Sequence, residues 1–189
     1  MDDRLSLFDR LLSCLSRVPT LRRWTARARR SAKDVGSTFE LGATALATIF
    51  EFSPGSDTHV GVNYRNFHDV EEDFAWARSC WGEIEFSMIG FRSGSYSRVS
   101  LEVDVDVFRP PIATHNGTDC YVYLGGVLIN CSALKDRSAI VVAIAPAMLS
   151  ETTNRLTFVV DKASRPDDYG VPDTRTLGIK LFSVRIVAS

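Results

Sequence analysis

The 189-residue sequence has no uninterrupted apolar run that approaches the roughly 20 residues needed to cross a bilayer as a helix. Its N-terminus lacks the order of a secretory signal, in which a charged start precedes an apolar stretch and small residues. Asp9, Arg10 and Arg17 interrupt the apolar positions there. We therefore expect a cytoplasmic protein.

Signatures of cofactor and nucleophile chemistry are missing as well. The sequence has no G-x-S-x-G, no phosphate-binding P-loop and no G-x-G-x-x-G. Its three histidines are not spaced like metal ligands, and its four cysteines contain no C-x-x-C pair. These are Cys14, Cys80, Cys120 and Cys131. We expect free thiols in a reducing compartment, and neither a metal nor a cofactor.

Charge is distributed unevenly along the chain, although the formal net charge is only −1. Residues 1–33 carry nine basic and three acidic side chains, whereas residues 34–189 carry 13 basic and 20 acidic ones. The apolar residues between Leu5 and Val18 recur in steps of three and four, which predicts an amphipathic helix that ends or bends at Pro19. We assign residues 1–35 to a short N-terminal basic amphipathic helical arm.

Beyond Pro19 the arm concentrates guanidinium groups around one aromatic ring. The residues concerned are Arg22, Arg23, Trp24, Arg27, Arg29 and Arg30. Such a run is compatible with a solvated tail, or with docking on an anionic membrane surface or an acidic protein. Nucleic-acid binding is disfavoured because no recognised nucleic-acid-binding motif accompanies the charge.

From residue 36 onward the sequence consists of short strand-like runs separated by turns. The clearest is the segment from Val99 to Val107, where apolar residues alternate strictly with Glu102, Asp104 and Asp106 on the other side. Residues 120–129 read as two strands joined at Gly125–Gly126. With no helical pattern between the runs, residues 36–189 are predicted to form an all-β domain, an antiparallel β-sandwich or jelly roll.

The order of these features resembles a known group of domains. Four motifs follow one another along the chain: "WGE" at residues 81–83, "YVYLGG" at 121–126, "IVVAIAP" at 140–146 and the final "SRPDDYGVPDTRTLGIKL". This order is similar to the β-sandwich, carbohydrate-binding-like accessory domains associated with glycosyltransferases of bacterial polysaccharide synthesis. The resemblance covers about residues 60–187. The chain departs from that pattern where Gly125–Gly126 replaces Asn-Gly and where no second aromatic follows Trp81–Gly82.

The most specific part of the resemblance is the approach to the last strand. This segment combines a proline, which restricts the backbone, with two glycines, which allow unusual backbone conformations, and with an acidic and a basic side chain. The residues are Pro166, Gly170, Asp173, Arg175 and Gly178. Side chains two positions apart project to the same side of an extended segment, so Asp173 and Arg175 can pair with each other or with the loop backbone. We predict a structural latch for the loop, with direct ligand contact as the alternative.

Candidate ligand contacts are aromatic, because sugar rings stack their apolar faces on aromatic rings. The candidates are Tyr64, Trp76, Trp81, Tyr121 and Tyr123. Of these, Tyr64 and Trp76 are expected to be exposed, whereas any of them can instead belong to the sandwich core. The acidic row on Val99–Val107 is expected to be a solvated face, or a site for Ca²⁺ or a basic partner such as the arm.

Together with the resemblance, these features predict a non-catalytic accessory protein of bacterial exopolysaccharide or cell-surface glycan synthesis. It would bind glycan, or a membrane-bound glycosyltransferase or synthase, with the arm docking at the cytoplasmic side of the inner membrane. A self-assembling structural protein, in which edge strands pair into a homo-oligomer, is the alternative. A less favoured alternative is a glycan-modifying enzyme that uses the acidic segment from His68 to Asp73.

Overall fold

The computed structural model describes residues 45–51, 62–88, 91–109 and 117–189. Within these ranges the chain forms ten β-strands, three 3-10 turns and no α-helix, which confirms the all-β prediction. The strands are β1 (Ala45–Glu51), β2 (Asn63–Arg65), β3 (Ala75–Trp76), β4 (Trp81–Phe86), β5 (Val99–Val107), β6 (Thr118–Leu124), β7 (Val127–Leu134), β8 (Ser138–Ile144), β9 (Asn154–Val160) and β10 (Ile179–Ala188). The 3-10 turns are η2 (Ser93–Ser95), η3 (Pro146–Met148) and η4 (Pro166–Tyr169).

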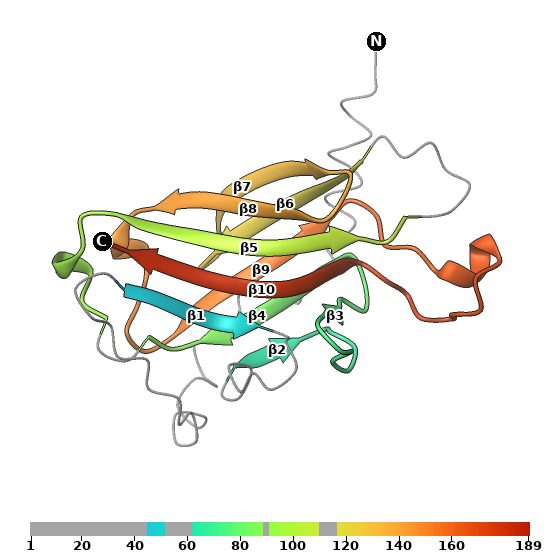
Figure 1. The fold of residues 1–189 in the computed structure, drawn as a ribbon, viewed down its shortest axis with the longest axis horizontal. Coiled ribbons are helices and arrows are strands. Elements are labelled where there is room, and N and C mark those ends of the chain that lie inside the picture. Colours follow the sequence, from blue (N-terminus) through green and yellow to red (C-terminus); the bar gives the residue numbers. More distant parts are fainter. Residues whose placement is uncertain (1–44, 52–61, 89–90, 110–116) are drawn as a thin grey trace, which may run out of the picture. The chain divides into compact units, whose positions relative to one another are not determined.

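The strands make two antiparallel sheets that pack face to face, as predicted for a sandwich. Sheet A has the order β1-β10-β5-β8, with β3 also paired to β10, and sheet B has the order β2-β4-β9-β6-β7. Figure 1 shows sheet A in front and sheet B behind it. The predicted helical arm lies outside the described residues. Within those residues, no helical segment has the length and apolar character that crossing a bilayer requires.

The core lies between the sheets, and strands β4 and β5 bury every second residue against it. Along β5 buried and half-buried positions alternate without exception, with Val103 and Val105 completely buried. Ile84 in β4 and Phe158 in β9 face them from sheet B, also with no exposed surface. Completely burying side chains of this size contributes about 1.5–3 kcal/mol each, so this alternation is the main local cause of the sandwich.

The hairpin between β6 and β7 turns at Gly125 and Gly126, as the sequence predicts. Their φ angles are +59° and +87°, and positive φ at both central positions is the requirement of a type I′ turn. Residues with a Cβ atom adopt this conformation only at a cost, which explains the two glycines.

Strand β10 organises sheet A. It pairs with β5 on one side, and on the other with both β1 and β3. A register shift between Leu181 and Ser183 interrupts its pairing with β5. Around this shift Leu181 and Val184 both point into the core, which leaves Phe182 and Ser183 outside the core cluster, on the outer face.

Candidate functional site

The loop before β10 is held at its start by a 3-10 turn. Pro166 is buried at the beginning of η4, and Gly170 ends the turn in the left-handed conformation with φ +81°. The Gly170 and Val171 amides donate to the carbonyl oxygens of Asp167 and Pro166, both at 3.1 Å. A pair of backbone hydrogen bonds between Ser164 and Leu177 then closes the base of the loop.

Asp173 and Arg175 do form an ion pair in this loop. The Arg175 Nη2 lies 2.7 Å from Asp173 Oδ2, and the Arg175 backbone amide donates to Asp173 Oδ1 at 2.9 Å. These hydrogen bonds lower the pKa of Asp173 to about 2. Arg175 also donates to Glu71 Oε1 at 2.8 Å, so the pair joins the loop to the segment before β3.

Gly178 brings the end of the loop against the same segment. Its amide donates to the Ala77 carbonyl at 2.9 Å, and the Ala77 amide donates to Ile179 at 2.8 Å. A Cβ atom at Gly178 would lie 1.9 Å from the Ser79 carbonyl oxygen, so only glycine permits this approach. The predicted latch residues thus lie in one loop that the backbone and one guanidinium tie to residues 71–79.

A chain of five aromatic rings begins in that loop and continues onto the outer face of sheet A. Successive ring centroids are 5.7–6.5 Å apart, in the range of favourable aromatic pairs. The rings belong, in order, to Tyr169, Phe108, Trp76, Phe74 and Phe182. We call this set the aromatic chain. Trp76 and Phe182 are buried, whereas the other three rings are half-buried and keep part of their surface in solvent.

Two cations pack on the aromatic chain. Lys180 Nζ lies 3.4 Å from the centroid of Phe74, and Arg137 Cζ lies 3.6 Å from the centroid of Phe182. Burial lowers the pKa of Lys180, although the nearby carboxylates of Asp73 and Asp106 act in the opposite direction. These contacts fix the rings and surround them with charged groups that can hydrogen bond to a polar ligand.

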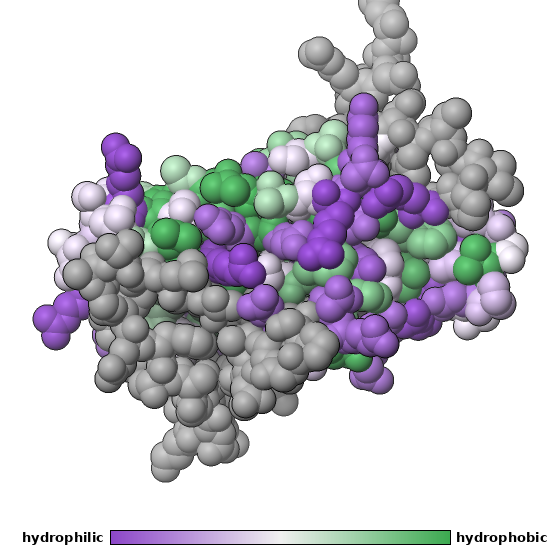
Figure 2. All heavy atoms as spheres, in the orientation of Figure 1, coloured by the Kyte–Doolittle hydropathy of each residue, from purple (hydrophilic) through white to green (hydrophobic). Residues whose placement is uncertain are grey.

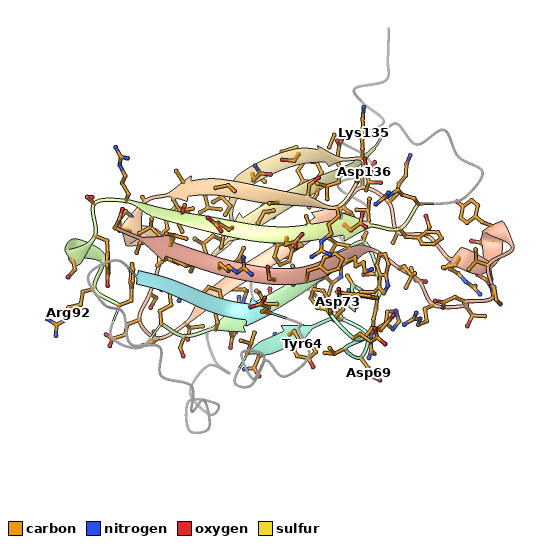
Figure 3. The ribbon with its side chains drawn as sticks, in the orientation of Figure 1. Tyr64, Asp69, Asp73, Arg92, Lys135 and Asp136 are labelled. Atoms are coloured by element: carbon orange, nitrogen blue, oxygen red, sulfur yellow. The ribbon has the colours of Figure 1, made fainter. Side chains whose placement is uncertain are left out.

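The acidic row of β5 lies on this face and is largely neutralised by arginines of the same domain. Arg137 forms a bidentate pair with Asp104, with a shortest distance of 2.7 Å. Arg109 joins Asp106 at 2.7 Å and Asp136 at 2.8 Å. Figure 3 labels Asp73 and Asp136, which in this view lie on opposite sides of β5 and β10. These pairs favour the expected solvated face over a calcium site.

Beside Phe182 the face is hollowed into an open groove of about 370 Å³. Arg137 and Asp104 line one part of the groove, and Glu102 and Arg185 line another. Ser183 of β10, which pairs with Asp104 of β5, also lines it. Figure 2 shows hydrophilic residues gathered across the middle of this face, with hydrophobic ones between them. Hydroxyl, carboxylate and guanidinium groups in an open groove next to aromatic rings match the hydrogen-bonding needs of a polyhydroxylated ligand.

The five predicted aromatic contacts do not form one site. Tyr64 is 39% exposed on edge strand β2, as expected, but the expected exposure of Trp76 is wrong because that residue is only 9% exposed. Phe74 and Phe108 pack against Trp76 from two sides, and this packing covers the ring. Trp76 therefore belongs to the aromatic chain as a supporting member.

Trp81, Tyr121 and Tyr123 lie on the outer face of the other sheet. Val159 pairs with both Trp81 and Tyr121, so these three form one row across sheet B. Tyr121 is 8% exposed, and burial is the main cause that raises its pKa to about 12. Tyr123 is half-buried and so keeps more exposed surface than Tyr121. The two tyrosines therefore lie on the same face of sheet B but differ in burial.

The acidic segment from His68 to Asp73 is tied to the latch. His68 Nε2 lies 3.0 Å from the carbonyl oxygen of Thr176, and Glu71 is held by Arg175. Two of its polar groups thus serve to attach the loop. The docking residues predicted in the basic arm lie outside the described residues. They are Arg22, Arg23, Trp24, Arg27, Arg29 and Arg30.

Three rings of the aromatic chain, Phe74, Phe108 and Tyr169, are not among the residues predicted from the sequence. Phe108 follows the last residue of β5, where it continues the apolar–polar alternation on the polar side, and this was the available signal. Tyr169 stands in the "PDDYG" turn, where a large ring has no local structural role. Only the fold shows that these rings join one chain of contacts, because 34 positions separate Phe74 from Phe108 and 61 separate Phe108 from Tyr169.

Known proteins offer only distant structural similarities to this chain. No family model and no curated protein matches the chain. Among solved structures, PorU from Porphyromonas gingivalis is similar with TM-score 0.40 and 10% identity over 81% of this chain and 13% of that one. An acetyl xylan esterase from Butyrivibrio proteoclasticus gives 0.40 and 12% over 78% and 33%. A β-glucuronidase from Ruminococcus gnavus gives 0.38 and 14% over 65% and 22%. The chain thus spans at most a third of these proteins, and the likeness is too distant to carry an argument about function.

Proposed function

We propose that this protein is a non-catalytic, glycan-binding accessory protein of bacterial exopolysaccharide or cell-surface glycan synthesis. The observation that supports the proposal is the aromatic chain beside the charged groove on sheet A. Partly exposed rings of Phe74, Phe108 and Tyr169 offer apolar surfaces on which sugar rings stack. The groove offers Ser138, Glu102 and the Arg137–Asp104 pair to sugar hydroxyls.

The distribution of charge favours a neutral or weakly charged glycan. Arg137 and Arg109 are already joined to carboxylates of the same face, so the charges of the described residues there are largely paired. Each hydroxyl of a sugar can accept from a guanidinium and donate to a carboxylate, and paired charges provide both partners side by side.

A glycan array with the full chain, followed by calorimetry on the best ligand, tests the proposal. Tyr169→Ala removes one half-buried ring from the loop, and we expect at least a tenfold loss of affinity. Tyr123→Ala, on sheet B, is the matched control and should bind as the wild type does. The absence of any glycan ligand, or turnover of the bound glycan, would contradict the proposal.

The basic arm is the segment that we propose to bind a membrane-bound partner. The arm would recruit the protein to a membrane-bound glycosyltransferase or synthase on the cytoplasmic side, because guanidinium groups and one tryptophan suit an anionic membrane surface. Deletion of residues 1–35 should abolish co-purification with membranes and leave the thermal melting of the sandwich unchanged. Membrane association that survives the deletion would refute this role.

A further inference from the structure

In the part of the chain that the structure describes, strand β8 is an edge of sheet A without the features that usually protect an edge. Among the described strands it pairs with β5 alone. Its sequence, SAIVVAI, contains no charged residue and no proline, and its pairing with β5 shows no bulge. Val141 at its centre is 62% exposed. Natural edge strands normally carry lysine, proline or a bulge, because free backbone groups and apolar side chains attract another strand.

Neighbouring surface extends this apolar edge. Strand β7 lies beside β8 at the same border of the sandwich, but in sheet B, so the two are not hydrogen bonded to each other (Figure 1). Its sequence, VLINCSAL, is also uncharged, and Val127 and Leu128 are 57% and 49% exposed. Both sheets thus end in uncharged strands on the same side of the molecule.

The sequence of β8 is compatible with its own copy in an antiparallel pair. If a two-fold axis passes beside Val141, that residue faces itself, and Ala139 faces Ala143. Arg137, which precedes the strand, then faces the uncharged Ala145 of the other copy. The two Arg137 side chains lie roughly 26 Å apart along the strands, so no like charges oppose each other.

We propose that two copies of this chain associate through β8, so that the two A sheets become one continuous antiparallel sheet. A second copy of the chain is the partner that fits this edge, because in the two-fold register every residue of β8 faces a small or β-branched, uncharged residue of the other β8. The pairing would also cover Val142, which is only partly buried against the core of one copy. This inference goes beyond glycan binding and does not depend on it.

The association would place the two grooves on one surface. Glu102 lies opposite Val141 on β5 and lines the groove, as do Ser138 and Ala139 of β8 itself. Across the two-fold axis the two Glu102 residues would be three strand spacings apart, roughly 14 Å. A long polymer could then contact both grooves at once, which a single copy does not allow.

A cysteine at the axis tests the register directly. In the full chain with Cys14→Ser and Cys131→Ser, Val141→Cys should form a disulfide-linked dimer under mild oxidation, reversed by a thiol reductant. Directly opposed residues in an antiparallel pair have Cα atoms 4.5–5.5 Å apart, which suits a disulfide. Val127, on β7, is similarly exposed but lies away from the axis, so Val127→Cys in the same background should remain unlinked. Equal linkage of both variants, or no linkage of Val141→Cys, would overturn the proposal.

A charge at the axis provides the second test, without covalent capture. We expect sedimentation of the wild-type full chain to show a concentration-dependent dimer, and Val141→Lys to sediment as a monomer at every concentration. Val70→Lys is the control, since Val70 is 39% exposed in the loop before β3 and should leave the dimer intact. Thermal melting of each variant confirms that it is folded. A wild type that is monomeric throughout, or a dimer that Val141→Lys leaves unchanged, would overturn the proposal.

Discussion

Arg175 donates hydrogen bonds to Asp173, two positions before it, and to Glu71, 104 positions before it. One guanidinium therefore holds the conformation of the last loop and attaches that loop to the segment that enters β3. The same loop carries Tyr169 and the same segment carries Phe74, so the positions of two rings of the aromatic chain depend on this attachment.

We expect Arg175→Ala to lower the free energy of unfolding by about 1 kcal/mol, because its two ion pairs are partly exposed and screened by solvent. Urea denaturation of the full chain measures this. Arg165→Ala is the matched control, since within the described ranges Arg165 pairs with one carboxylate, that of Asp167, in a more exposed part of the same loop. The loss of stability should be smaller there. Equal effects of the two substitutions would contradict a special role for Arg175.

Substitution of Gly178 should cost more stability than that of Arg175, because its backbone lies so close to Ser79. Gly178→Ala places a methyl group against the Ser79 carbonyl oxygen, so the backbone must move, and we expect a loss of about 3 kcal/mol or more in unfolding free energy. Gly94→Ala meets no atom within 4 Å and should be close to neutral. Differential scanning calorimetry compares the two. A Gly178→Ala protein that melts as the wild type does would show that the loop can approach β3 differently.

Asp173 makes stability depend on pH in a defined direction. Its pKa is lowered from 3.8 to about 2, so its contribution is fully present above pH 3.8 and is lost as the pH falls towards 2. Asp173→Asn lacks this contribution at any pH. We therefore expect the stability difference between wild type and Asp173→Asn to shrink between pH 4 and pH 2, as measured by urea denaturation. A difference that stays constant over this range would contradict the assignment.

The β6–β7 turn allows a paired test of backbone conformation. Gly126→Ala forces a residue with a Cβ atom into φ +87° and should destabilise the protein by about 1 kcal/mol. Gly125→Asn creates the Asn-Gly pair that type I′ turns prefer, and should be neutral or slightly stabilising. Chemical denaturation of both variants gives the comparison. If both changes are neutral, the turn adopts a different type in solution.

Local sequence pattern was sufficient for most strands. The strict alternation from Val99 to Val107 predicted β5 and its buried side, and the glycine pair predicted the hairpin between β6 and β7. Alternation is reliable here because one face of each strand packs on a single core, and a shift by one residue would expose every apolar side chain. The pairing of Asp173 with Arg175 was predictable for a similar reason, since both belong to one short extended segment.

The sequence by itself thus determined which of the longer segments are strands, which sides of them are buried, and that Asp173 and Arg175 of the last loop can pair. The tertiary structure alone decided which side chains become neighbours on the outer faces. Trp76 became buried because Phe108, 32 positions further along the chain, packs on it together with the nearby Phe74, and the register shift after Leu181 turned Phe182 outward. Contacts of this kind depend on strand order and on the register between strands, and a local pattern of apolar and polar residues records neither.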